Sequence, residues 1–111
     1  MPSARRSFLG EFEQRLLLAI LRCGERPRPV DIRRELARVS NQEVSRGAFY
    51  TTLDRLEAKK LIKSTTVAGN AVRDGLPDRY CRVSPAGLRA LKASRRTLLE
   101  LWSGLEWILE R

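Results

Sequence analysis

Residues 45–62, SRGAFYTTLDRLEAKKLI, decide the fold and raise the question of function. Three apolar residues recur at helical spacing and predict one inward face: Phe49, Leu53 and Leu56. Ser45 is a suitable N-cap, and Val44 before it can pack against Phe49 in the fourth helical position. Because each residue advances a helix by about 100°, Arg46 and Tyr50 lie on another face. The segment therefore predicts a short helix that is anchored on one side and presents basic and aromatic groups on the other.

Gly47 is unusual in the first turns of a helix, where it costs about 0.8–1.0 kcal/mol relative to alanine. A missing side chain at this position would let a bulky partner approach the backbone closely. An exposed glycine with no particular role is the alternative, and the sequence alone does not separate the two.

Two helices are predicted before this segment. The first covers residues 9–24 and ends at Gly24, with apolar residues at helical spacing at Leu9, Phe12, Leu16, Ile20 and Leu21. The second covers residues 26–40, and Pro29 and Asp31 suit its first turn. Its inward stripe is predicted to be Ile32, Leu36 and Val39. Residues 41–43 form the turn that leads into the third helix.

A β-hairpin is predicted after the third helix. Residues 61–68 (LIKSTTVA) and 79–84 (RYCRVS) alternate as strands do, and residues 69–78 form a loop or hairpin tip that is rich in glycine and aspartate. A two-stranded hairpin is marginally stable alone and must pack on the helices. Arg73 lies at the tip and Arg79 on the returning strand.

Residues 84–111 predict a long final helix, with Ser84 as its cap and Pro85 as its first residue. Its apolar residues follow three- and four-residue steps, which Arg95 interrupts: Leu91, Leu98, Trp102, Leu105 and Leu109. A chain of 111 residues cannot readily cover so long a helix on two faces. This row therefore predicts a homodimer interface, and packing within a monomer is the alternative.

Charge is concentrated in the middle of the chain. The whole sequence has 22 Lys and Arg against 13 Asp and Glu, a net charge of +9, with a pI of about 10.7. Residues 44–98 hold 12 of the basic and only 4 of the acidic residues. Such a balance favours a polyanionic partner, and a solvated surface without a partner is the alternative.

Composition argues against several other classes. The chain contains no histidine, the commonest general base, and Cys23 and Cys81 are far apart, so neither an enzyme nor a metal site is expected. We expect both cysteines to be reduced and no cofactor to be bound. No apolar run reaches the roughly 20 residues of a membrane span, and no signal peptide is evident, so a cytoplasmic protein is predicted.

The predicted order is helix, helix, helix, hairpin, helix. The fold class is therefore mainly α with a small β-hairpin: a winged helix-turn-helix domain at residues 1–83 and a long dimerisation helix at residues 84–111, forming one compact unit. In such a domain the third helix enters the major groove and the hairpin is the wing. The predicted DNA-binding residues are Ser45, Arg46, Gly47, Tyr50, Thr51, Arg55, Lys63, Arg73 and Arg79.

Three blocks in this order resemble the PadR family of bacterial transcriptional regulators: LGEFEQRLLLAIL, GAFYTTLDRLEAKKLI and RYCRVSPAGLRAL. The resemblance covers the chain from about Leu9 to its end. It implies a winged-helix domain, a C-terminal dimerisation helix and repression through an inverted-repeat operator in promoter DNA. It also implies a nucleoid-associated bacterial protein, and a small aromatic effector held against Trp102, for which plain packing is the alternative.

The chain departs from the family pattern at three places. Lys60 replaces the usual glycine after the third helix, RPRPV replaces a Tyr-Gly pair before the second helix, and the segment DGLPDRY carries acidic residues in the wing. A different class of function also fits the pattern, namely a winged-helix adaptor or anti-repressor that binds another protein through its last helix. The oligomeric state separates the adaptor from the repressor.

Overall fold

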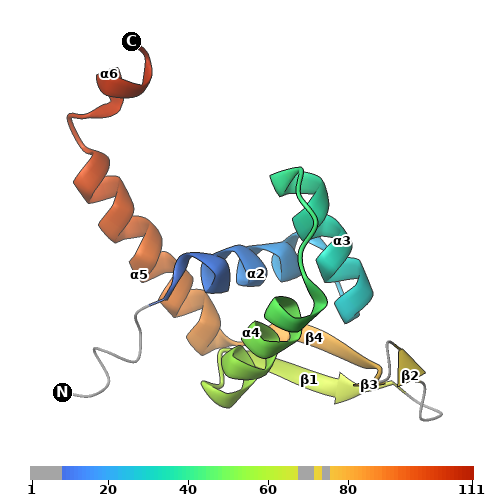
Figure 1. The fold of residues 1–111 in the computed structure, drawn as a ribbon. Coiled ribbons are helices and arrows are strands. Elements are labelled where there is room, and N and C mark those ends of the chain that lie inside the picture. Colours follow the sequence, from blue (N-terminus) through green and yellow to red (C-terminus); the bar gives the residue numbers. More distant parts are fainter. Residues whose placement is uncertain (1–8, 68–71, 74–75) are drawn as a thin grey trace.

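The computed structural model describes residues 9–67, 72–73 and 76–111. Three helices form the first half of the chain: α2 (Glu11–Arg22), α3 (Pro29–Ser40) and α4 (Arg46–Ala58). The strands β1 (Ile62–Thr66), β2 (Val72–Arg73), β3 (Leu76–Pro77) and β4 (Arg79–Val83) follow, and then α5 (Pro85–Trp102) and α6 (Glu106–Leu109). Figure 1 shows α2 at the centre, with α3, α4 and α5 around it and the strands below.

The helix starts follow local chemistry. The Ser45 hydroxyl accepts a hydrogen bond from the Ala48 N–H at 3.1 Å, as an N-cap should. Ser84 caps α5 in the same way by accepting from the Gly87 N–H at 3.1 Å. At the start of α3, the Asp31 carboxylate accepts from the Arg28 N–H at 2.9 Å. These caps confirm the predicted starts.

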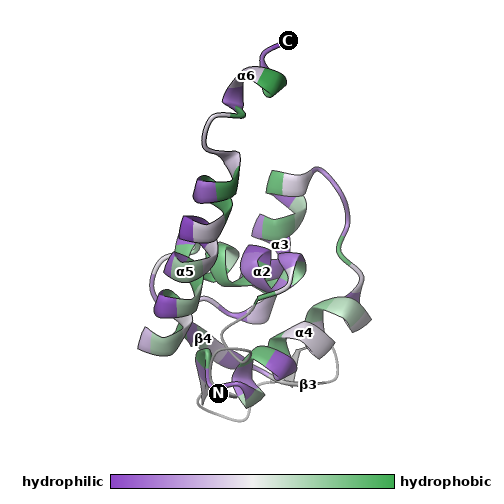
Figure 2. Cartoon of the chain, turned by 90° about the vertical axis from the view of Figure 1, so that its left-hand side faces the viewer, coloured by the Kyte–Doolittle hydropathy of each residue, from purple (hydrophilic) through white to green (hydrophobic). Residues whose placement is uncertain are grey.

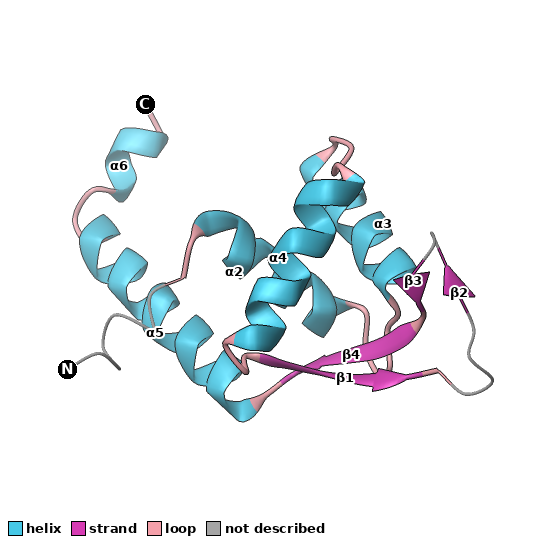
Figure 3. Cartoon of the chain, turned by 60° about the horizontal axis from the view of Figure 1, so that its bottom comes forward, coloured by secondary structure: helices cyan, strands magenta, loops and turns pink. Residues whose placement is uncertain are grey.

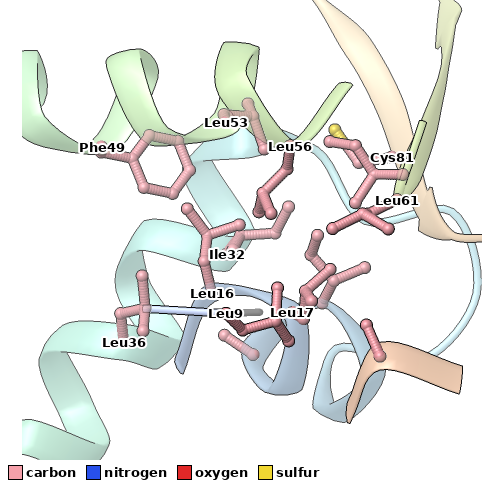
Figure 4. Packing of buried hydrophobic residues seen from close by; sticks show 14 residues of the cluster. Leu9, Leu16, Leu17, Ile32, Leu36, Phe49, Leu53, Leu56, Leu61 and Cys81 are labelled. Carbon is pink, nitrogen blue, oxygen red and sulfur yellow. The ribbon is translucent and has the colours of Figure 1, made fainter. Parts of the chain in front are cut away.

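One apolar core joins the helices to the base of the hairpin. Figure 4 shows side chains of α4, α3 and α2 pointing toward one another within it. The three anchors predicted on α4, Phe49, Leu53 and Leu56, are fully buried, and Cys81 of β4 is 1% exposed. Burial raises the pKa of the Cys81 thiol to about 11, and Cys23 and Cys81 are not bonded to each other.

Two residues predicted to face the core do not. Leu21 is 44% exposed and Val39 is 61% exposed. Val39 lies near the C-terminal end of α3, beyond the last buried residue of that helix, Leu36. Leu21 is followed by Cys23, which packs against the core, so Leu21 lies beside the buried face of α2 rather than beyond it. Leu18, which is 49% exposed, joins Val39 in lining a groove of about 510 Å³ between α2 and α3. The predicted inward face was therefore too wide on α2 and too long on α3.

The hairpin consists of two antiparallel ribbons. β1 pairs with β4 from Ile62 opposite Val83 to Thr66 opposite Arg79, and the short β2 pairs with β3 beyond them. The segment predicted as a loop at residues 69–78 therefore holds a second short ribbon. Residues 68–71 and 74–75, and the first eight residues of the chain, lie outside the described part.

The predicted final helix is not continuous. α5 ends at Trp102, and Gly104 adopts a φ of +83°, a left-handed conformation that turns the chain before the single turn of α6. The three- and four-residue spacing therefore does not carry one face from Trp102 through Leu105 to Leu109. Only the first turns of α5 pack on the core, and Figure 1 shows the rest extending away from the body. Figure 2 shows apolar positions along α5.

Candidate nucleic-acid interface

α4 and the hairpin lie beside each other on one side of the molecule (Figure 3). The buried stripe fixes α4, and the opposite side of the helix remains open. Six of the predicted binding residues lie on or just before α4. Tyr50 is half-buried, and the other five are exposed: Ser45, Arg46, Gly47, Thr51 and Arg55. The predicted division into an anchored and a presented face is therefore present in the structure.

Arg46 and Tyr50 form the flank of α4 nearer the hairpin. The Arg46 guanidinium lies 5.6 Å from the centre of the Tyr50 ring, and that ring meets Phe49 edge-on with 5.2 Å between ring centres. The cation–π contact orients Arg46, while the contact with Phe49 ties Tyr50 to the core. Tyr50 therefore has a structural role as well as a position on the presented face.

Gly47 lies in the first turn of α4 with open space around it. A side-chain carbon placed on it would meet nothing within 4 Å among the described residues. Glycine is therefore not required there by packing. The helix N-terminus also carries backbone N–H groups and a partial positive charge, which favour a phosphate.

Arg55 lies at the opposite flank, near α2. The neighbouring Lys59 Nζ lies 2.8 Å from Oε2 of Glu13, which is 7% exposed. Burial alone would raise the pKa of the Glu13 carboxyl, but the Lys59 hydrogen bond, the Gly10 N–H and the charges of Lys59 and Arg55 together hold that pKa below its ordinary value. Glu13 therefore stays ionised and ties α4 to α2.

The hairpin residues occupy two faces of the ribbon. Lys63 is exposed and lies directly opposite Arg82 in the strand register, so both side chains lie on the outer face. Arg79 lies on the inner face and is 20% exposed, with its guanidinium bound to carboxylates of α4. Arg73 lies in β2 opposite Leu76, and its side chain is outside the described part of the structure.

The residues predicted at the dimer interface fall into two groups by their burial. Leu91 is half-buried and packs against the core. The other four are exposed, Leu98 by 48%, Trp102 by 40%, Leu105 by 43% and Leu109 by 70%. More apolar side chains on the same segment are at least 40% exposed, namely Leu88, Leu99, Leu101, Trp107 and Ile108. So large an apolar surface is unusual on a soluble monomer.

Sequence reasoning missed several contacts that join distant segments. Asp54, Glu57 and Asp78 were not singled out, yet each binds an arginine from another element. The RPRPV segment, which departs from the family pattern, also contacts the hairpin. Arg26 contacts the Tyr80 ring, and Arg28 donates a hydrogen bond to Asp78. Two departures from the family pattern were the available signals, namely the RPRPV segment and the acidic residues of DGLPDRY, which include Asp78. In the described part of the chain no helix could span a membrane, and no cluster of potential metal ligands occurs.

Comparison with solved structures identifies the architecture. A PadR-like transcription factor from Bacteroides fragilis superposes with a TM-score of 0.70 at 23% identity, covering 96% of each chain. A winged-helix DNA-binding protein from STIV superposes with a TM-score of 0.64 at 14% identity, covering 79% of this chain and 87% of that protein. This chain has the winged-helix fold. The predicted winged-helix fold, mainly α with a small β-hairpin, and the resemblance to PadR-like proteins are therefore confirmed at the level of the fold.

Sequence comparison adds one curated relative of this winged-helix chain. The transcriptional regulator Rv3488 of Mycobacterium tuberculosis is 47% identical over 58 residues. That match spans 52% of this chain and 50% of the relative, so the chain covers about half the length of the regulator it resembles. No protein-family model matches the chain.

Proposed function

We propose that this winged-helix protein is a PadR-type regulator of transcription that binds promoter DNA as a homodimer. One observation supports the proposal most directly: α4 buries Phe49, Leu53 and Leu56 completely and leaves Arg46 and Thr51 exposed beside a basic hairpin. A helix held in this way can enter the major groove without disturbing the core. The exposed cations of α4 and the hairpin would then meet the phosphates.

In this proposal the roles are divided by position. Arg46, Tyr50 and Thr51 would face the base edges, because the N-terminal part of a recognition helix contacts bases. Ser45 and Gly47 would bring backbone N–H groups to a phosphate. Lys63, and Arg73 nearer the tip, would supply phosphate contacts from the hairpin. Such contacts position the protein, whereas base contacts give specificity.

The proposed dimer rests on the exposed apolar side chains of α5 and α6. We assign residues 1–83 to DNA binding and residues 84–111 to dimerisation. A two-fold dimer would present two copies of α4 to an inverted repeat, and its binding at a promoter would repress transcription. A flat aromatic effector would lie against Trp102 in that interface, where this residue is 40% exposed.

Binding to DNA fragments tests the proposal. The intact protein should prefer a fragment of its own promoter region over a random duplex of equal length. The logarithm of its affinity should also fall linearly with the logarithm of salt concentration, because counterions are released. Equal affinity for promoter and random duplexes would refute the specific regulator.

A second candidate, an adaptor that binds another protein through α5 and α6, rests on the same exposed surface. Light scattering separates the two. A stable homodimer supports the regulator, whereas a monomer that pairs only with a different protein supports the adaptor.

A further inference from the structure

Arg79 begins β4, and its guanidinium is held by two carboxylates of α4. Nη1 lies 2.8 Å from Oε1 of Glu57, and Nη2 lies 3.1 Å from Oδ1 of Asp54. The Ser64 hydroxyl on β1 donates to the same Glu57 oxygen at 2.9 Å. Both strands of the hairpin are therefore bonded to one side of α4.

The register of the hairpin explains why Arg79 points this way. Side chains alternate between the two faces of a strand, and directly opposed residues share a face. Three pairs share the inner face, namely Ile62 with Val83, Ser64 with Cys81, and Thr66 with Arg79. Cys81, in the middle of this set, is 1% exposed in the core. Arg79 therefore extends the inner face of the ribbon and points toward α4 rather than outward.

The residues on either side of Arg79 are bonded to a third segment. Oδ2 of Asp78, a residue only 3% exposed, lies 3.0 Å from Nη1 of Arg28, and the Arg26 guanidinium lies 4.4 Å from the centre of the Tyr80 ring. Arg26 and Arg28 belong to the loop between α2 and α3. Asp78, which precedes β4, and Arg79 and Tyr80, which begin it, thus bind alternately to the α2–α3 loop and to α4, so the hairpin is fixed from two directions.

The surroundings of Arg79 do not suit a phosphate. Asp54, Glu57 and Asp78 line the hollow of about 310 Å³ between α4 and the hairpin. A phosphate that displaced the carboxylates from Arg79 would leave Asp54 and Glu57 unpaired beside the DNA backbone. Like charges at that distance repel, so the exchange would be unfavourable.

From these contacts, and resting on the proposed function, we propose that Arg79 is a positioning residue of the wing. It bridges β4 to Asp54 and Glu57, so that the hairpin and α4 approach DNA as one rigid surface, and it makes no phosphate contact of its own. Arginine suits this role because its planar fork reaches two carboxylates at once.

A charge exchange tests the bridge. Arg79→Gln removes the cation, and Arg79→Glu with Glu57→Arg restores an ion pair in the opposite orientation at the same net charge. Using a mixed-sequence duplex of about three helical turns, we expect Arg79→Gln to weaken binding about tenfold and the exchanged pair to recover most of that loss. The salt dependence of binding should keep its slope in Arg79→Gln. A slope reduced by about one charge in Arg79→Gln would show a phosphate contact instead.

Hydrogen exchange without DNA tests the same bridge independently of DNA binding. Amides of the β1–β4 ladder should exchange faster in Arg79→Gln, because the hairpin opens more often once it loses the ion pairs with α4. Their exchange rates should return to wild-type values in the exchanged pair. Arg82→Gln is the matched control, since Arg82 lies on the outer face and forms no ion pair with any described residue. Unchanged exchange in Arg79→Gln would overturn the proposal. Failure of the wild-type protein to bind any duplex would instead reject the proposed function.

Discussion

Arg46 and Arg55 lie on opposite flanks of α4. They are nine residues apart, which corresponds to about 180° around the helix, and Arg46 contacts Tyr50 whereas Arg55 lies near Glu13. In the proposed complex, a helix in the major groove cannot direct both guanidinium groups to the same bases. The proposal therefore predicts that the two flanks contribute differently to binding.

We expect the two arginines to give different binding defects. Arg46→Ala should reduce preference for the operator by about 1–3 kcal/mol, as the loss of a base contact does. Arg55→Ala should weaken binding to all sequences alike and reduce the salt slope by about one charge, as the loss of a phosphate contact does. Competition titrations with operator and random duplexes measure both effects. The same defect in both variants would show that the flanks are equivalent.

Tyr50 needs a gentler substitution, because its ring packs against Phe49. Tyr50→Phe keeps this contact and removes only the hydroxyl group. We expect a melting temperature close to that of the wild type and weaker operator binding. Wild-type affinity in this variant would exclude the hydroxyl group from the interface.

Substitution of Gly47 should affect stability and DNA binding in opposite directions. Gly47→Ala should stabilise the fold by about 0.5–1 kcal/mol, because helix propensity improves and the added methyl group meets open space. It should nevertheless weaken DNA binding, because the methyl group would stand between the backbone and the phosphate. Chemical denaturation and a binding titration on the same protein measure the two effects. A stabilised variant with unchanged affinity would show that Gly47 has no role in recognition.

Lys60 occupies the left-handed conformation that ends α4, with a φ of +65°. This is the position where the PadR pattern usually has glycine, and a side chain there costs about 1–2 kcal/mol in strain. Lys60→Gly should therefore stabilise the fold, by up to about 1 kcal/mol once the added freedom of the unfolded chain is subtracted. Lys60→Ala is the control, since it keeps the strained side-chain carbon and should bring no gain. Equal stability of both variants would argue against strain at this turn.

Glu35 links α2 to α3 and makes stability depend on pH. Hydrogen bonds from Arg38 and then from Arg22, with the charges of both arginines, lower the pKa of the Glu35 carboxyl from 4.5 to about 2. The folded-state pKa is depressed, so the stabilisation is present above the unfolded pKa of about 4.5 and is lost as the pH falls toward 2.

Glu35→Gln should therefore be less stable than the wild type at neutral pH, and the two should converge as the pH falls through this window. Urea denaturation at several pH values measures the difference. Glu43→Gln is the control, because Glu43 is exposed and pairs with no cation among the described residues. A difference in unfolding free energy between Glu35→Gln and the wild type that did not change with pH would contradict a lowered pKa of Glu35.

The sequence predicted those features that depend on neighbouring residues. Ser45 and Ser84 sit before helices with free N–H groups to satisfy, and Phe49, Leu53 and Leu56 repeat at the helical period, so caps and anchored faces follow from local chemistry. The hairpin followed from its alternating pattern for the same reason.

Features that depend on distant partners could not be predicted in this way. Periodicity shows which face of a helix is apolar but not how far its neighbours extend, so Leu21 and Val39 were placed inside. The break at Gly104 was concealed by apolar residues at helical spacing on both sides of it. Arg79 could be placed on a strand, but its carboxylate partners lie 22 and 25 positions earlier in the chain.

Hydroxyl-radical footprinting of the wild-type protein on its own promoter tests the central claim most directly. A homodimer that presents two copies of α4 should protect two half-sites whose centres lie about one helical turn, or a multiple of it, apart on one side of the duplex. A single protected half-site, or uniform protection without register, would contradict a symmetric pair of recognition helices.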